Sequence, residues 1–324
     1  MGLEASQQTS TRDIPDEAIA RAAPEFFQKL RDTSAAKNLT FNLDEFAVLM
    51  GSNRKWSWHP AKHVGGVSVR ETKEVFTACC CLSSAAGELV ELQVVWKGKT
   101  SGVHALPAEA HAKIFQDHQP TSHFQTADTF SRLVDRIVGY VAAKRAWLNT
   151  PDAPAVLIVD AAPQHSDVSA LATANISVVD IPKSQTHVFQ PADQFIIACI
   201  KQKVNLAWDK FVEKTFADNE TAAAIAELMV TSRKVVRRRM YSFLADAVDQ
   251  LTVNCIVASW EVTGIPRAMW SDMPVRQILV DAVMERVMGD CECGNRTPWI
   301  CDHCEEHVCS GCRMDHRGVV CTAL

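Results

Sequence analysis

The sequence predicts an α/β domain with a mixed five-stranded sheet flanked by helices, followed by a helical region and a small cysteine-rich module. The apolar runs VFTACCCLSS and ELVELQVVWKG are joined by the turn-forming residues 85–88, which predicts a hairpin. The later runs PAVLIVDA and ISVVDIP are continuous and apolar, as expected for sheet strands that are covered on both faces. Segments with helical periodicity separate and follow these strands.

The elements follow in a definite order. A short strand, LTFNLDEF, precedes the hairpin, and a helix over 126–148, capped by Thr126 or Asp128, follows it. The two later strands come next, with a helical connection between them. A long amphipathic helix over 190–214 completes the domain.

The chain is expected to divide into four parts. These are a polar and then weakly helical N-terminal segment (1–37), the α/β domain (38–215), a helical extension (216–285) and the cysteine-rich module (286–324). At 324 residues and 47% hydrophobic, the chain can bury one substantial core and a small appendage.

Charge and hydropathy exclude some classes of function. The net charge of −5 gives no overall attraction to nucleic acid, so any such binding must come from local basic patches. The strongest basic run lies at 233–239, and it is either a phosphate-contacting patch or nuclear localisation signal, or a solvated helix face balanced by nearby acids. No apolar run is long enough for a membrane span, so no membrane partner is expected. The N-terminus lacks the apolar segment of a signal peptide.

Three aspartates lie where the predicted elements should bring them together. Asp44 is on the first strand, Asp160 ends the fourth strand and Asp193 opens the last helix. Three carboxylates at one edge of a sheet can hold two divalent metal ions ~3.5–4 Å apart, an arrangement that cuts and joins phosphodiesters. A single aspartate at any of these positions would more often be a cap or turn residue.

Other polar residues near these aspartates are ambiguous. Glu45 is next to Asp44 but should point to the opposite face of the strand. His165, in the loop after the fourth strand, either orients a water, a ligand or a phosphate, or is an ordinary loop histidine. Gln190 is expected to satisfy backbone groups before the last helix rather than to touch substrate.

The C-terminal cysteines predict a zinc module. Seven of the 12 cysteines lie between Cys291 and Cys321, and without a secretory signal such a cluster indicates metal binding rather than disulfides. Eight candidate zinc ligands form four pairs that suggest two cross-braced ions, the first and third pairs sharing one ion and the second and fourth the other. One zinc with spare thiols is the alternative, and His303 and His307 are substitute ligands. The eight candidates are Cys291, Cys293, Cys301, Cys304, Cys309, Cys312, His316 and Cys321.

Four segments resemble the DDE superfamily endonucleases of the pogo, Tigger and jerky type, the group that includes centromere protein B. FNLDEF is similar to their N-x-D-E-T box, the hairpin to their hairpin, and VLIVDAAPQH to their L-L-L-D-N-a-x-x-H strand. VVDIPKSQTHVFQPADQFIIACIK resembles their last box most specifically. The residues in register there are Pro182, Thr186, Gln190, Pro191 and Asp193. The resemblance covers residues 38–210, and the layout of the tail resembles RING and PHD fingers and the tail of piggyBac-type transposases.

The resemblance implies a ribonuclease-H-like fold and metal-dependent cleavage and strand transfer on DNA. Asp44, Asp160 and Asp193 are then the catalytic residues, with Asp44 and Asp160 holding one Mg²⁺ or Mn²⁺ and Asp44 and Asp193 the other. DNA is the expected partner, in the nucleus of a eukaryotic cell, with a homodimer and contacts to chromatin or protein left open.

Departures from the family pattern support a second hypothesis. Phe46 stands where the family has Thr, Ala161 where it has Asn and Phe195 where it has Gly. Loss of the residues that support a metal site typically costs 10–100-fold in affinity or activity. The alternative is therefore a decayed or domesticated transposase that binds DNA, chromatin or protein through its zinc module. A zinc-finger ubiquitin ligase is a third hypothesis, supported by the cysteine spacing alone.

Overall fold

The protein is known from a computed structural model. It describes residues 16–49, 55–56, 67–68, 75–83, 87–101, 110–121, 124–160, 169–218, 233–279, 289–290 and 296–297. The predicted zinc ligands and His165 lie outside these residues, so the zinc module stays a prediction.

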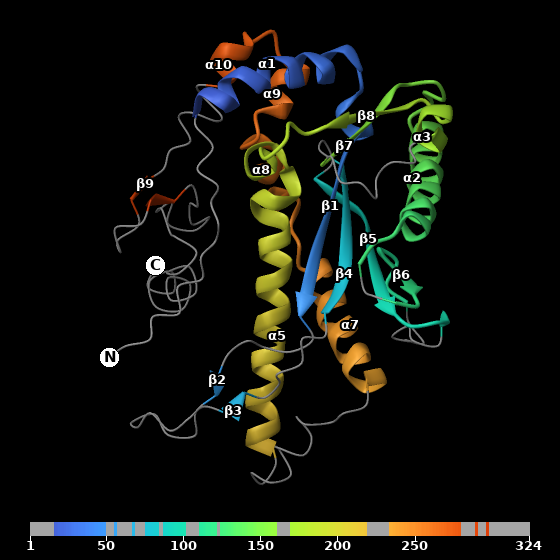
Figure 1. Ribbon diagram of the computed structural model, residues 1–324, viewed down its shortest axis with the longest axis vertical. Helices are drawn as coiled ribbons and strands as arrows, with labels where there is room; N and C mark the ends of the chain where they lie inside the picture. The colour runs from blue at the N-terminus through green and yellow to red at the C-terminus, as the bar shows by residue number, and fades with distance from the viewer. Residues whose placement is uncertain are drawn as a thin grey trace.

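A mixed sheet forms the centre of the molecule (Figure 1), with strand order β6-β5-β4-β1-β7-β8. β4 is antiparallel to β1 and β5, and the other neighbouring pairs are parallel. The strands of this sheet are β1 (Thr40–Leu49), β4 (Val75–Ser83), β5 (Glu88–Lys97), β6 (Ile114–Gln119), β7 (Ala155–Val159) and β8 (Ile176–Asp180). Two small ribbons pair β2 (Lys55–Trp56) with β3 (Val67–Ser68), and β9 (Gly289–Asp290) with β10 (Arg296–Thr297).

The sheet has six strands rather than the predicted five. All five predicted strands are present, and β6 adds a sixth beside β5 at the edge. Its sequence IFQDHQ lacks the apolar alternation that marks a strand. Its polar residues are instead matched by neighbours: Gln116 accepts the indole N–H of Trp96 at 3.0 Å.

Helices cover both faces of the sheet and close one end of it (Figure 1). α2 and α3 pack on one face, α5, α7 and α8 on the other, and α1, α9 and α10 lie across the end. The α-helices are α1 (Asp16–Asp32), α2 (Ala127–Trp147), α3 (Ser169–Thr173), α4 (Thr186–Phe189), α5 (Ile197–Asp218), α7 (Arg233–Asp249), α8 (Val253–Glu261), α9 (Ile265–Trp270) and α10 (Val275–Leu279). The 3₁₀-helix η1 (Lys37–Leu39) precedes β1, and the π-turn η4 (Ala192–Ile196) precedes α5.

Alternation along the central strands assigns side chains to two cores. In β1, Phe41 and Leu43 face the core under α2, whereas Phe46 and Val48 face the core under α5. Successive side chains of a strand point to opposite faces. The even-numbered residues of β1, Asp44 among them, therefore face α5.

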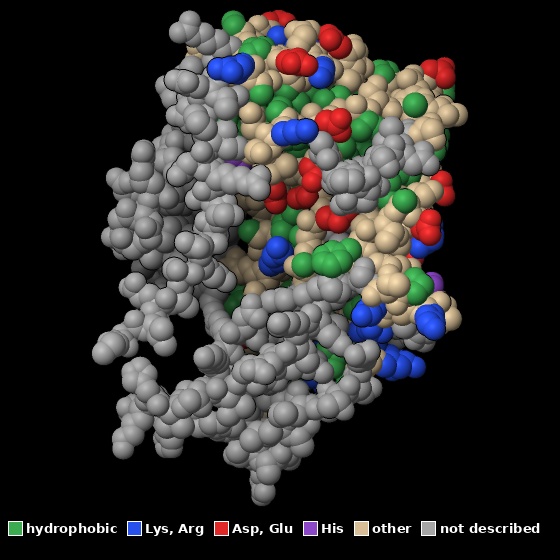
Figure 2. Space-filling view, in the orientation of Figure 1, with side chains coloured by type: hydrophobic (Ala, Val, Ile, Leu, Met, Phe, Trp, Pro, Cys, Tyr) green, Lys and Arg blue, Asp and Glu red, His purple; other side chains and the backbone are tan. Residues whose placement is uncertain are grey.

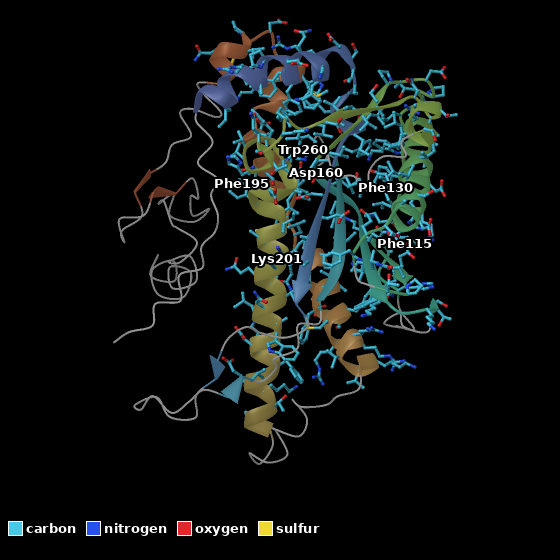
Figure 3. All side chains as sticks on the ribbon, in the orientation of Figure 1. Phe115, Phe130, Asp160, Phe195, Lys201 and Trp260 are labelled. Carbon is cyan, nitrogen blue, oxygen red and sulfur yellow. The ribbon has the colours of Figure 1, made fainter. Side chains whose placement is uncertain are left out.

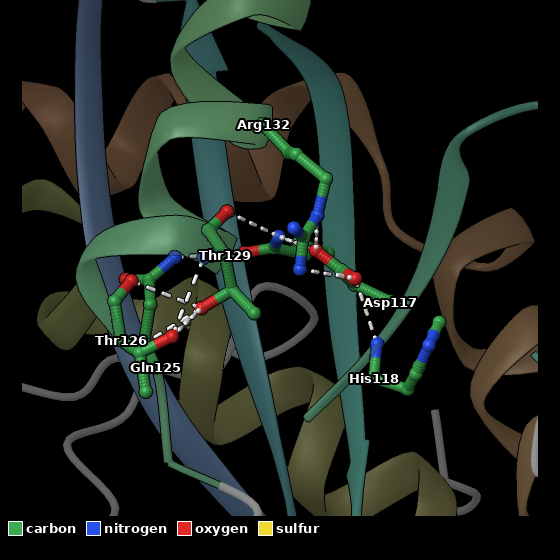
Figure 4. A network of polar contacts seen from close by, with 7 residues as sticks. Asp117, His118, Gln125, Thr126, Thr129 and Arg132 are labelled. Atoms are coloured by element: carbon green, nitrogen blue, oxygen red, sulfur yellow. Dashed lines mark hydrogen bonds and ion pairs between the residues drawn. The ribbon is translucent and has the colours of Figure 1, made fainter. Parts of the chain in front are cut away.

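A buried polar network fixes α2 on the sheet (Figure 4). The guanidinium of Arg132 donates to both oxygens of Asp117 on β6, at 2.8 and 2.9 Å. Gln93 of β5 donates to Asp117 and to the backbone carbonyl of Thr129, at 3.2 and 2.9 Å. The helix begins at the predicted cap, where the side chain of Thr126 accepts the Thr129 N–H. Such a network orients the helix because a buried polar group left without a partner is costly.

The predicted helix over 190–214 is present in modified form. It begins as the π-turn η4, in which the Ile197 N–H donates to the Ala192 carbonyl, five residues back. It continues as α5 to Asp218. The apolar pattern near residue 250 predicted helix throughout, but a break at 250–252 separates α7 from α8.

No helix in the described part of the chain is long and apolar enough to cross a membrane.

The β4–β5 turn packs tightly under α8, which generates a stability prediction. Gly87 has φ +57°, and a Cβ built there would lie 2.5 Å from the Val253 side chain and 2.8 Å from its carbonyl oxygen. We expect Gly87→Ala to lower the free energy of unfolding by roughly 1–3 kcal/mol, because both the backbone and the contact would be strained. Gly139 of α2 has open space around it, so Gly139→Ala should raise stability by about 0.5–1 kcal/mol. Urea denaturation of both variants measures this, and a neutral Gly87→Ala would contradict the packing.

Candidate active site

Asp44 and Asp160 lie opposite each other on adjacent strands. β1 and β7 are parallel, with Thr40 paired to Val156 and Asn42 to Ile158. Extending this register by two residues places Asp44 beside Asp160, which follows directly after β7. Side chains two residues apart share a face. Both aspartates therefore belong to the face that α5 covers, and Asp44 lies within β1, which continues to Leu49, rather than at its end.

Asp193 reaches the same place from the π-turn above that face. It is the second residue of η4, and its charge acts on Asp44. The turn is held from the other side by α8: the Ser259 hydroxyl donates to the Pro191 carbonyl at 2.5 Å and accepts the Phe195 N–H at 3.3 Å. The sheet and α8 thus fix the position of Asp193 between them.

Asn42 joins the three segments that carry the aspartates. Its amide donates to the Ile158 carbonyl of β7 at 3.0 Å, and its carbonyl oxygen accepts the Ala192 N–H of η4 at 3.0 Å. The side chain is fully buried. Our sequence analysis assigned no role to Asn42, although the residue is the first of the N-x-D-E pattern within FNLDEF. The signal available in the sequence was an asparagine two residues before an aspartate, and therefore on the same face of the strand.

Gln190 adds a second tie between the π-turn segment and β1. Its buried side chain donates to the Leu43 carbonyl at 3.0 Å. Gln190 therefore bonds to backbone before the last helix, as the sequence suggested, and the bond it makes lies next to Asp44. Together the two amides hold the turn on the strand at residues adjacent to the aspartates.

The environment of Asp44 disfavours its negative charge. Burial raises the pKa of Asp44 well above its ordinary range, and the negative charges of Asp193 and Asp160 raise it further. One oxygen, Oδ1, accepts the Glu45 N–H at 2.7 Å, which opposes this shift. The other oxygen, Oδ2, is buried and accepts no hydrogen bond from the residues that the structure describes.

The pKa of Asp193 is raised less strongly than that of Asp44. Removal of water from its carboxylate raises the pKa of Asp193, although part of the residue reaches solvent, and the charge of Asp160 adds to the effect. A hydrogen bond shared with Asp44 lowers the pKa, as do the positive charges of Lys201 and His187. A shared proton or a nearby cation would therefore offset the repulsion between the carboxylates of Asp44 and Asp193.

The chemistry of these side chains suits a divalent cation. Carboxylate oxygens are preferred ligands of Mg²⁺, and the buried Oδ2 of Asp44 has no other partner. As the side chains are placed, however, no three His, Cys, Asp or Glu residues of the described chain are close enough together to hold one ion. The assignment of Asp44, Asp160 and Asp193 as metal ligands stays a prediction.

The basic run at 233–239 does not present all of its charges to solvent. Arg237 is buried, with its guanidinium 5.6 Å from the ring centre of Trp96 and one nitrogen donating to the Lys97 carbonyl at 2.9 Å. Arg239 stacks on Phe211 at 3.7 Å. Two of the arginines thus pack on aromatic side chains of β5 and α5. Lys234 and Arg238 are exposed.

Asn42 generates the first prediction for the site. Asn42→Leu should lower the free energy of unfolding by roughly 1–3 kcal/mol, because the Ala192 N–H and the Ile158 carbonyl would be left buried without partners. Gln28→Leu is the matched control, since the exposed Gln28 bonds, among the described residues, only to Asp32 on the surface of α1. It should change stability by no more than about 0.5 kcal/mol. Equal urea midpoints for the two variants would refute the role of Asn42.

The raised pKa of Asp44 predicts a pH dependence. In the ion-free protein, folded Asp44 keeps a proton at pH values where the unfolded chain, with an aspartate pKa of about 3.9, has lost it. The stability that Asp44 contributes is therefore full below that pH and falls as pH rises through the raised folded pKa. Asp44→Asn cannot titrate, so its stability advantage over the native chain should grow upward from about pH 4.

Urea denaturation in EDTA between pH 4 and pH 8 measures this difference. Asp135→Asn, at an exposed position of α2, should instead follow the native curve in parallel. An advantage of Asp44→Asn that does not change with pH would show that Asp44 titrates normally.

A family model and solved structures were compared with the chain. The model described as DDE superfamily endonuclease matches residues 73–260, which include Asp160 and Asp193 and begin after Asp44. The chain is similar to the Mos1 transposase of a pre-cleavage transpososome, with 11% identity and a TM-score of 0.41 over 76% of this chain and 64% of that chain. It is also similar to the catalytic domain of Mos1 mariner transposase, with 11% identity and a TM-score of 0.37 over 76% and 93% of the two chains.

The family model and the solved structures do not support the assignment equally. The chain spans less than two thirds of the transposase chain in the transpososome, and no curated protein matches it. At such TM-scores the solved structures add nothing to the assignment, whereas the family model covers more than half of the chain. The chain therefore belongs to the family of DDE superfamily endonucleases.

Proposed function

We propose that this chain is a metal-dependent endonuclease that cuts and joins phosphodiester bonds of DNA. The observation that carries the proposal is that Asp160 lies in register with Asp44 on one strand face, with Asp193 of η4 near enough for its charge to act on Asp44. Membership of the DDE superfamily endonuclease family supports the same chemistry. We assign this activity to the domain over 38–215, with the helical extension over 216–285 packed against it through α8.

The three aspartates would hold two Mg²⁺ or Mn²⁺ ions. Such ions, when bound, activate water or a 3′-hydroxyl and stabilise the leaving oxygen. The chain itself orients the ligands: Asn42 ties β1, β7 and η4 together, and Glu45 fixes one oxygen of Asp44. The other oxygen is buried and accepts no hydrogen bond from the described part of the chain, which suits it to bind a cation.

The charge of the site supports an anionic substrate only when cations are present. Three neighbouring carboxylates repel a phosphate, and two bound divalent ions would reverse that sign. DNA is the proposed partner, with the nucleus of a eukaryotic cell as its place of action. A homodimer and partners on chromatin are further proposals that rest on the family resemblance.

A nicking assay on supercoiled DNA tests the proposal. The native chain should nick the plasmid with Mg²⁺ or Mn²⁺ and not in EDTA. Asp160→Asn should lower the rate at least 100-fold, because it removes one ligand charge with little change of shape. Asp135→Asn, on the solvent side of α2, should keep the native rate.

Two results would overturn the proposal. Equal nicking by Asp160→Asn and the native chain would place the activity elsewhere. Native protein that fails to nick the plasmid with any divalent ion would favour a transposase that has lost catalysis and binds its partners instead.

We also propose that residues 286–324 bind zinc through Cys291, Cys293, Cys301, Cys304, Cys309, Cys312, His316 and Cys321. The spacing of these residues supports this proposal, and they lie outside the described residues. The segment is too short to fold on an apolar core alone, so zinc would supply most of its folding free energy. Metal analysis of the purified protein should find about two zinc ions per chain. A zinc content near zero would refute it.

A further inference from the structure

Two cysteines from distant parts of the chain meet between α5 and α8. Cys199 lies on α5 and Cys255 on α8, 56 residues apart in the chain, and the two sulfur atoms are 3.5 Å apart. Neither is in a disulfide, and both are half-buried. Our sequence analysis gave neither cysteine a role, because nothing in the sequence relates two positions so far apart.

The cysteine pair continues the contact that fixes the turn η4 on α8. The Phe195 N–H of η4 donates to the Ser259 hydroxyl of α8 at 3.3 Å. Cys199 comes four residues after Phe195, and Cys255 comes four residues before Ser259. Residues four apart lie on one face of a helix, one turn from each other. The two sulfurs therefore meet one helical turn from the bond that holds η4.

The pair lies to the side of the carboxylate site. Figure 3 places Phe195 and Trp260 near the upper end of α5, close to Asp160 in this view, and Figure 2 shows acidic side chains gathered in that region of the visible face. A π-turn takes up one extra residue, so the step from Asp193 to Cys199 covers the rotation of about five residues rather than six. Cys199 is therefore about 140° around the axis from Asp193. A bond at Cys199 would join α5 to α8 without entering the site.

The contact between the thiols suits their conversion to a disulfide. The sulfurs of a disulfide are about 2.04 Å apart, so these two need to approach by about 1.5 Å. Rotation about the Cα–Cβ bonds moves both sulfurs, and each needs to supply only part of that approach. Thiolate is the form that reacts, and Cys255 is in the first turn of α8, where the helix dipole favours an anion.

We propose that Cys199 and Cys255 are a redox site, which hydrogen peroxide converts to a disulfide that clamps the turn carrying Asp193 to α8. The Cys255 thiolate attacks one peroxide oxygen, the O–O bond breaks, and the hydroxide released takes up the thiol proton to form water. The resulting sulfenic acid is attacked at sulfur by the Cys199 thiol, so that the S–S bond forms and a second water leaves. The two thiols lose two electrons, and the peroxide gains them.

The link would restrain η4 whatever reaction the chain catalyses. Two hydrogen bonds of Ser259 now hold this turn to α8. A disulfide would add a covalent tie one helical turn away and would close a loop spanning 56 positions in the unfolded chain. Local opening that separates η4 from α8, and so exposes the Phe195 N–H, should become rarer. This inference goes beyond the proposed function and does not depend on it.

Peptide mapping of the full chain tests whether the disulfide forms. Tryptic peptide 184–201 contains Cys199 as its only cysteine, and peptide 240–267 contains only Cys255. The chain is treated with hydrogen peroxide, its remaining thiols are alkylated, and the digest is analysed by mass spectrometry. The two peptides should appear linked, lighter by two hydrogens than their sum, and dithiothreitol should separate them. Alkylation of both cysteines at every peroxide concentration would overturn the proposal.

Hydrogen exchange and thermal melting test whether the disulfide clamps the turn. The matched control is Cys255→Ser, which keeps every other cysteine of the chain and cannot form the bond. Compared with this variant after the same peroxide treatment, the native chain should melt about 5–10 °C higher, as expected for a typical disulfide. Exchange of the Phe195 amide should slow on oxidation of the native chain and stay unchanged in Cys255→Ser.

Two results would contradict the clamp. A linked peptide with no change in melting or in exchange of the Phe195 amide would show that the disulfide does not restrain η4. Equal changes in the native chain and in Cys255→Ser would assign them to other cysteines. Cys199→Ser should behave as Cys255→Ser does, and a difference between the two variants would show that the cysteines do not act as a pair.

Discussion

The arrangement of the acidic site depends on the two hydrogen bonds of the buried Asn42 amide. One side chain donates to β7 and accepts from η4 while its own backbone belongs to β1. Each of these segments carries one aspartate within two residues of the bond. An amide is suited to this place because it both donates and accepts, which no carboxylate or hydrophobic side chain of similar size can do at neutral pH. The fold thus brings together three like charges by means of a neutral group.

The repulsion among the three carboxylates opposes folding, and the packing of the surrounding side chains must offset this repulsion. The face that holds the aspartates is backed by the larger core, in which Trp208 and Trp260 are almost fully buried. Phe26 and Phe27 of α1 also pack there against Phe189, with ring centres 5.2 and 5.5 Å from it. Apolar burial of this kind is the main favourable term in folding. It can therefore sustain a site whose own charges repel until a cation or proton is bound.

Most of the sheet could be predicted because its strands are marked by apolar runs and by a turn with glycine. β6 could not, because the residues that stabilise it are polar and their partners, such as Arg132, lie in a different element. Counting elements predicted that the three aspartates would meet, but it could not predict that β1 continues beyond Asp44, since that depends on pairing with β4. The π-turn was also missed, because an apolar pattern read at 3.6 residues per turn does not reveal one extra residue. Arg237 looked like a surface cation because sequence gives no sign that Trp96 lies beside it.

The helical layer at the end of the sheet is joined by contacts between distant parts of the chain. Arg31 of α1 donates to the carbonyls of Ala268 and Met273 at 2.5 and 2.7 Å, across 237 and 242 residues. Contacts of such long range form late in folding, because the loop between them must close first. During synthesis, the side of α1 that contacts α9 must wait for α9 to emerge. The sheet can be complete before α8 emerges, so the contacts of Ser259 that hold the turn carrying Asp193 form only afterwards.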